Sequence, residues 1–263
     1  MKKKLLIIGI DGASFDVINP MIKERKLPTI AKLMEEGVSF EIFSSRPSVT
    51  CTAWPSLVTG KNPGNHGIID WHYYRSNYTE HFHNGKDIKG KRFWDYLGDE
   101  GIKNAIINVP ITYPPYKING YMISGFPSVG EQVQFTYPKE LREELLKENY
   151  QIDSVSRDTL SDQQFLDKIN NLMETRKKVC LDLMRKKPWD VFFTVFRPEP
   201  IQNRFWGKNR GVIEDTYERM DKYIEELMKN YKEKLDVIVI SDHGFGRTPE
   251  YNFYLNNWLS ENN

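Results

Sequence analysis

Short apolar runs recur along the chain and are separated by longer segments of mixed polarity. The runs are rich in Val, Ile, Leu and Phe, and they cover residues 4–10, 104–109, 191–196 and 235–240. Runs of this length and composition are typical of strands that are buried on both faces of a parallel sheet. Residues 38–43 predict one further short strand.

The segments between these runs predict helices. Apolar residues follow a helical spacing across residues 21–36, where Pro28 breaks the pattern and Gly37 ends it. Further helices are expected at 50–59, 93–97, 138–148, 162–185 and 211–231. Strands that alternate with helices favour an α/β fold, with a mostly parallel, doubly wound sheet covered by helices on both faces.

The length of 263 residues suits one large domain or a domain with an inserted lobe. Residues 70–92 are aromatic and polar without a clean period, and they predict an irregular inserted segment. We therefore expect a single α/β domain over residues 1–263. A chain cut short at its C-terminus stays open as an alternative to a full-length one.

Composition excludes several classes of protein. The formal net charge of +1 creates no field that would favour a nucleic-acid polymer or a membrane surface. Cys51 and Cys180 are too few for a disulfide framework or a four-cysteine zinc site. The apolar runs are too short to span a bilayer, and the one behind the N-terminal lysines is too short for a signal peptide. These features predict a cytoplasmic protein and leave its oligomeric state open.

Acidic residues stand directly behind two of the predicted strands. Asp11 follows the first run, and Asp242 and His243 follow the last one. Ligands of open α/β sheets bind beyond the carboxyl ends of the strands, so we expect these side chains to meet although they are far apart in the chain. Carboxylate oxygens and an imidazole nitrogen suit a divalent metal such as zinc. A role of Asp11 as a turn former or helix cap stays open.

Thr50 precedes a predicted helix and is a candidate nucleophile. A hydroxyl at this place lies where backbone N–H groups without acceptors point outward, which suits a bound phosphoryl group. Metal coordination would activate the hydroxyl. The alternative is that Thr50 only caps the helix.

Several motifs resemble a known family. They are Gly9-Ile10-Asp11-Gly12, residues 50–60, residues 61–68, and Ser241-Asp242-His243-Gly244-Phe245. Together they resemble the type I phosphodiesterase/nucleotide pyrophosphatase branch of the alkaline phosphatase superfamily. Residues 108–115 resemble its subgroup of predicted phosphohydrolases and phosphomutases. The likeness runs in order from residue 4 to about 258, and it implies an alkaline-phosphatase-like fold.

The resemblance also implies a set of site residues. Members of this family hold two metal ions, usually zinc, around a threonine or serine nucleophile. Carried over to this chain, the nucleophile is Thr50, and the ligands of one ion are Asp11, Thr50, Asp242 and His243. Zinc is the expected metal, with manganese or magnesium as alternatives. Thr52 and Ser48 rank lower as nucleophiles.

The second metal site of the family departs from the pattern. Glu199 stands where the family has aspartate, and Asn203 stands where it has histidine. The sequence contains no histidine after His243. Asparagine is a poor zinc ligand, so we expect one bound ion and a degraded second site.

The function implied by the resemblance is metal-dependent hydrolysis of phosphate esters through a phosphothreonine intermediate. The substrate would be a small phosphodiester or a nucleotide pyrophosphate. Two alternatives stay open: a catalytically degenerate relative that serves in binding or assembly, and a phosphomutase that uses the same site.

Overall fold

The computed structural model describes residues 3–74, 76–127, 133–152, 160–231, 235–246 and 253–262. A six-stranded sheet in the order β6-β5-β4-β7-β1-β8 forms its centre. Neighbouring strands are parallel except β5 and β6, which are antiparallel. The strands are β1 (Lys4–Ile10), β4 (Asn104–Ile107), β5 (Gly120–Ile123), β6 (Thr136–Tyr137), β7 (Val191–Phe196) and β8 (Leu235–Ile240). The predicted α/β class with a mostly parallel sheet is confirmed.

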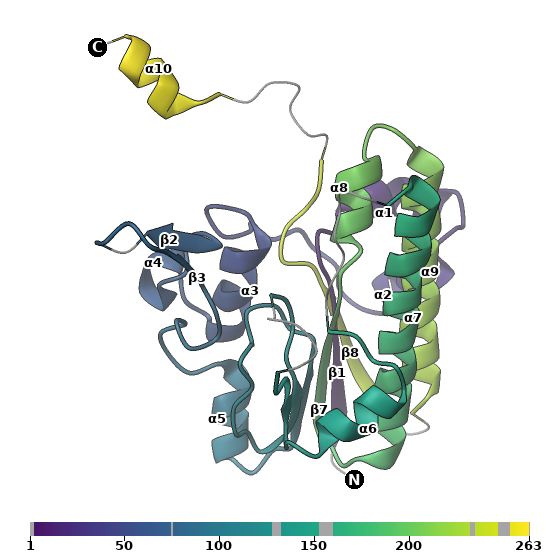
Figure 1. Ribbon diagram of the computed structural model, residues 1–263. Helices are drawn as coiled ribbons and strands as arrows, with labels where there is room; N and C mark the ends of the chain where they lie inside the picture. The colour runs from purple at the N-terminus through teal and green to yellow at the C-terminus, as the bar shows by residue number, and fades with distance from the viewer. Residues whose placement is uncertain are drawn as a thin grey trace.

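Helices cover both faces of the sheet (Figure 1). One face carries α1 (Phe15–Lys23), α2 (Pro28–Glu36), α7 (Asp162–Lys186), α8 (Glu199–Phe205) and α9 (Arg210–Lys229). The other face carries α3 (Thr50–Thr59) and α5 (Phe93–Asp99), with α4 (Pro63–His66) beyond them. The remaining helices are α6 (Leu141–Lys147) and α10 (Leu255–Glu261), and a hairpin of β2 (His72–Tyr74) and β3 (Glu80–Phe82) lies beside α4.

Alternation along β1 explains why both faces are buried. Leu6 and Ile8 point into the core cluster that includes residues of α7 and α9. Ile7 points the other way and packs with Trp54 of α3 and with Phe193 of β7. The apolar run after Lys4 is therefore covered on both sides.

The predicted helix over residues 21–36 is two helices in the structure. Pro28 begins α2, where its fixed φ and missing N–H cost nothing because the first N–H groups of a helix have no acceptor within it. The segment 70–92, predicted to be irregular, contains the β2–β3 hairpin.

The predicted strand over residues 38–43 is wrong. The structure has no strand there, and Val38, Phe40, Ile42 and Phe43 are exposed. Alternating polarity is a local signal, whereas a strand also requires a neighbour to pair with.

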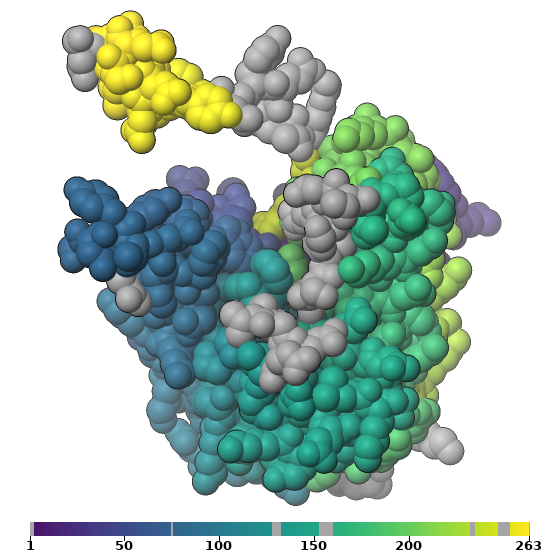
Figure 2. Space-filling model, in the orientation of Figure 1, coloured from purple at the N-terminus to yellow at the C-terminus, as the bar shows by residue number. Residues whose placement is uncertain are grey.

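Apolar side chains are also exposed on β8, which is an edge strand of the sheet. Its Ile238 and Val239 are 44% and 37% exposed. α10 buries none of its residues and stands clear of the rest of the molecule in Figure 2. Across the described ranges, every helix is too short or too polar to cross a bilayer.

Candidate active site

The ends of β1 and β8 bring three potential metal ligands together. The two strands are parallel neighbours, and Gly9 lies opposite Ile240. Asp11 follows β1, and Asp242 and His243 follow β8, so all three emerge at the carboxyl edge of the sheet. One oxygen of each carboxylate and one imidazole nitrogen lie within 4.8 Å of one another. This is the convergence that the strand-end positions predict.

The hydroxyl of Thr50 joins the same cluster. Its Oγ1 donates a hydrogen bond to Oδ1 of Asp11 at 3.2 Å and lies 3.0 Å from Nε2 of His243. The N-cap of α3 is Val49, so Thr50 is the first residue of the helix and not its cap. The hydroxyl of Thr52 turns away from the cluster, because it donates to the backbone carbonyls of Pro47 and Val49.

Asp11 is held by Trp54, one helical turn after Thr50. The indole Nε1–H donates to Oδ2 of Asp11 at 3.0 Å, and both side chains are buried. Gly9 makes room for the indole, since a Cβ at this position would lie 2.5 Å from the Trp54 ring. Asp11 caps no helix: Ser14 caps α1.

Asp242 is buried with one oxygen bonded and the other available. Oδ1 accepts the N–H of Gly12, whose φ of +74° suits a residue without a side chain. Oδ2 has no hydrogen-bond partner in the described part of the chain, and it lies 3.4 Å from Nε2 of His243. Burial, and after it the negative charge of Asp11, raise the pKa of Asp242 above its usual range.

These donors fit a divalent cation. Two carboxylates, an imidazole and a hydroxyl match the ligand types and number of a tetrahedral zinc site. A cation would also remove the repulsion between the two carboxylates and give Oδ2 of Asp242 a partner.

The two residues predicted to hold a second metal ion, Glu199 and Asn203, form a hydrogen bond with each other. The side-chain amide of Asn203 donates to Oε1 of Glu199, and the guanidinium of Arg197 donates to Oε2 of Glu199 at 3.1 Å. Among the described residues, the group that could hold an ion comprises Asp11, Asp242 and His243 without Glu199.

Two residues that contact the cluster were missed by the sequence analysis. Trp54 lies four positions after Thr50, and this spacing places both on one face of a helix. Arg197 follows the fully buried β7 directly, as Asp11 follows β1. A charged residue directly after a buried strand is the signal that would have identified it.

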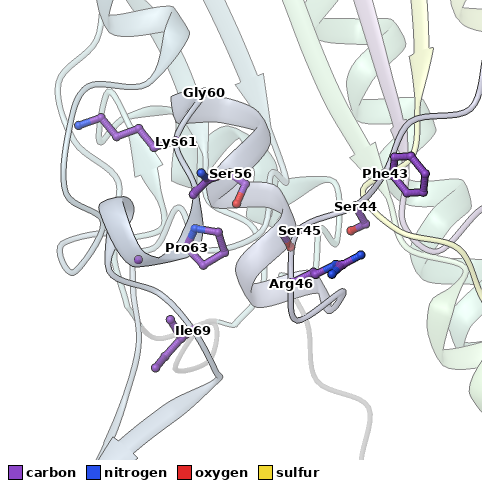
Figure 3. A pocket seen from close by; sticks show the side chains of 11 residues that line it. Phe43, Ser44, Ser45, Arg46, Ser56, Gly60, Lys61, Pro63 and Ile69 are labelled. Atoms are coloured by element: carbon purple, nitrogen blue, oxygen red, sulfur yellow. The ribbon is translucent and has the colours of Figure 1, made fainter.

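A cleft borders α3 on the side of the loop that precedes it (Figure 3). Its volume is about 610 Å³, and its lining includes Ser44, Arg46, Ser56 and Lys61. Ser44 connects the cleft to the cluster, because its hydroxyl donates to the backbone carbonyl of Asp242 at 2.7 Å. Arg46 and Lys61 contribute basic side chains to the lining of the cleft, and Figure 3 shows these two side chains pointing away from each other.

His66 supports the turn beside this cleft and not the metal cluster. Its Nε2 lies 2.9 Å from the hydroxyl of Ser56, and its Nδ1 accepts the N–H of Ile68. Since Nδ1 accepts a hydrogen bond, the ring is the neutral tautomer with its proton on Nε2. Burial lowers the pKa of His66 and keeps it neutral.

Residues 5–263 match the type I phosphodiesterase / nucleotide pyrophosphatase family. The chain belongs to this family. Comparison with curated protein sequences gave no match.

Solved structures with the same fold include phosphonoacetate hydrolase from Sinorhizobium meliloti 1021 in complex with phosphonoformate. It is 17% identical, with a TM-score of 0.73 over 99% of this chain and 62% of its own. Murine ectonucleotide pyrophosphatase/phosphodiesterase 5, as an inactive threonine-to-alanine variant with AMP, is 15% identical. Its TM-score is 0.63, over 95% of this chain and 59% of its own. At these identities the likeness shows the fold, and this chain spans about three fifths of the length of either protein.

Proposed function

We propose that this family member is a metal-dependent phosphoester hydrolase that uses Thr50 as its nucleophile. The observation that carries the proposal is the position of the Thr50 hydroxyl, between Asp11 and His243 and at the start of α3. The inactive threonine-to-alanine variant of the murine relative supports a threonine in this role.

One ion is held by Asp11, Asp242, His243 and Thr50 in this proposal. When bound, a divalent ion lowers the pKa of the hydroxyl and offsets charge on the phosphoryl group. A hydroxyl nucleophile requires such activation.

The chain itself supplies the nucleophile and its orientation. Oγ1 of Thr50 forms a bond to phosphorus as the bond from phosphorus to the leaving oxygen breaks, and that oxygen takes the electron pair. The hydroxyl proton passes along the existing hydrogen bond to Asp11. Water then attacks phosphorus, and the bond from phosphorus to Oγ1 of Thr50 breaks. Oγ1 takes the electron pair and regains the proton from Asp11, and a proton of the attacking water passes to the oxygen that left first.

The start of α3 and the adjacent cleft bind the substrate. Val49 offers no side-chain cap, and the first N–H groups of a helix have no acceptor within it. They and the positive end of the helix dipole suit phosphoryl oxygens. The rest of a phosphodiester or nucleotide substrate lies in the cleft of Arg46 and Lys61.

Replacement of the two nearby threonines tests the proposal. With zinc bound and bis(4-nitrophenyl) phosphate as substrate, Thr50→Ala should lower kcat at least about a hundredfold, because a nucleophile acts with its partners as a unit. Thr52→Ala is the matched control and should stay within about fivefold of wild type, since its hydroxyl faces backbone carbonyls. Acid-quenched wild type should carry the phosphoryl adduct on Thr50. Equal losses in the two variants, or an adduct elsewhere, contradict the assignment.

A non-catalytic member of the family is the second candidate. The observation that favours it is the mutual hydrogen bond of Glu199 and Asn203, which occupies both residues expected at the second metal. Zinc binding by the wild type without turnover of any phosphoester would support this candidate.

A further inference from the structure

Arg197 directly follows β7 and lies beside Asp11, one of the three potential metal ligands. β7 pairs with β1 in parallel, and Phe196 lies opposite Ile10. Arg197 and Asp11 are therefore the next residues of adjacent strands, and the backbone N–H of Asp11 donates to the carbonyl of Phe196 at 2.9 Å. The Arg197 side chain is only 6% exposed.

The guanidinium of Arg197 lies between the carboxylates of Asp11 and Glu199 and packs on an aromatic ring. Its Nε is 3.7 Å from Oδ2 of Asp11, and its Nη2 donates to Oε2 of Glu199. It also lies over the ring of Phe126, 4.0 Å from the centroid. A buried charge with these contacts has a defined position, because each contact restricts the planar group in a different direction.

The guanidinium occupies the space between Asp11 and Glu199 in which a second metal ion would have to bind. A two-metal site sets its ions among neighbouring carboxylates, and here those are Asp11 and Glu199. Both oxygens of Glu199 already accept hydrogen bonds, from Arg197 and from Asn203. A second divalent ion at Glu199 would lie against the guanidinium and be repelled by it.

We infer that Arg197 is the second fixed positive charge of this site, which takes one divalent ion and binds an anionic phosphate oxygen through the guanidinium. The inference rests on the proposed function, because it names the residue that holds the phosphate group in that reaction. A guanidinium keeps its charge at any working pH and matches phosphate oxygens with parallel N–H donors. The ligand class is therefore a phosphate ester that carries at least one negative oxygen.

Zinc stoichiometry and phosphate affinity test the inference without an activity assay. Equilibrium dialysis with zinc should give one ion per chain in the wild type and in Arg197→Met, which keeps the apolar stem and removes the charge. Titration of the zinc-loaded proteins with inorganic phosphate should show a Kd at least about tenfold higher in Arg197→Met. Arg210→Met is the matched control at an exposed arginine, and its phosphate affinity should equal that of wild type.

Two further variants keep the test decisive if Arg197→Met fails to fold. Arg197→Lys retains a positive charge, and it should bind one zinc ion and hold phosphate more weakly than wild type because the planar donor pair is lost. The double variant Glu199→Asp/Asn203→His restores the family's ligand types, yet it should still bind one ion while Arg197 is present.

Three results overturn the inference: two zinc ions per wild-type chain, two ions in the double variant with Arg197 in place, or phosphate affinity unaffected by loss of the arginine charge. Failure of the proposed function has a different signature. A wild type that binds no zinc would overturn that function and the inference with it, whereas full phosphate affinity in Arg197→Met overturns the inference alone.

Discussion

Asp242→Asn should stabilise the metal-free protein and destabilise the zinc-loaded one. The substitution keeps the shape of the side chain and the acceptor for the N–H of Gly12, and it replaces the oxygen that has no hydrogen-bond partner with an amide group. It removes the negative charge that lies against Asp11. The same change removes a metal ligand in the proposed site.

The magnitude follows from the separation of the two carboxylates. Their ligand oxygens lie within 4.8 Å, and two unit charges at that distance repel by about 3.5 kcal/mol at an effective dielectric constant of 20. The positive charge of Arg197, 3.7 Å from Asp11, offsets part of this repulsion. We expect the metal-free variant to gain about 1–3 kcal/mol in its free energy of unfolding at pH 8.

The gain should depend on pH with a definite sign. Burial and Asp11 raise the pKa of Asp242 in the folded state, so the folded protein binds a proton that the unfolded chain has released. The stability of the metal-free wild type therefore falls as pH rises from the unfolded pKa, near 4, through the raised folded value. Asp242→Asn lacks this loss, so its advantage should vanish near pH 4 and grow towards pH 8.

Urea unfolding with EDTA, and with excess zinc, at several pH values measures these effects. In zinc the order should reverse, because wild type gains about 4 kcal/mol at a ligand concentration of 1,000 Kd and the variant gains less. Asp236→Asn is the control, since its exposed pair with Lys3 should be worth less than about 1 kcal/mol. A metal-free Asp242→Asn that is less stable than wild type at pH 8, or equally improved at pH 4 and pH 8, would refute the reasoning.

Three further outcomes are expected. Gly9→Ala should lower the urea midpoint by the equivalent of about 1–3 kcal/mol, because its Cβ would lie 2.5 Å from the Trp54 ring. His66→Phe should cost about 1–3 kcal/mol through lost buried hydrogen bonds, and dialysis should show the same zinc stoichiometry as wild type. Burial raises the pKa of Cys51 and Cys180 to about 12, so a thiol reagent at pH 8 should label the native protein slowly and both thiols after denaturation.

The sequence predicts the positions of Asp11 and Asp242 but not that of Arg197, because the first two depend only on where parallel strands end. Asp11 and Asp242 each follow an apolar strand, and parallel strands end at a common edge whatever their order. The place of Arg197 depends on strand order, since it lies beside Asp11 only because β7 pairs with β1. The local pattern of apolar residues does not show which strands pair when those strands are distant in the chain.

The same limit explains the two main errors in the predicted elements. Residues 38–43 carry a strand pattern but have no pairing partner among the described residues. The short strands β5 and β6 gave no clear apolar run, and they form because β4 offers an edge with which β5 can pair. In both cases the neighbour decides the outcome, and the neighbour is a property of the whole fold.

The position of β8 also sets the order of events during synthesis. β1, β7 and β4 pair with one another, and all three are complete before the ribosome reaches residue 235. Two of the three grouped ligands, Asp242 and His243, follow β8 and dock only when that edge strand joins β1. The order of synthesis therefore permits most of the sheet to form before the ion can bind, and a bound metal would link β1 to the strand that is added last.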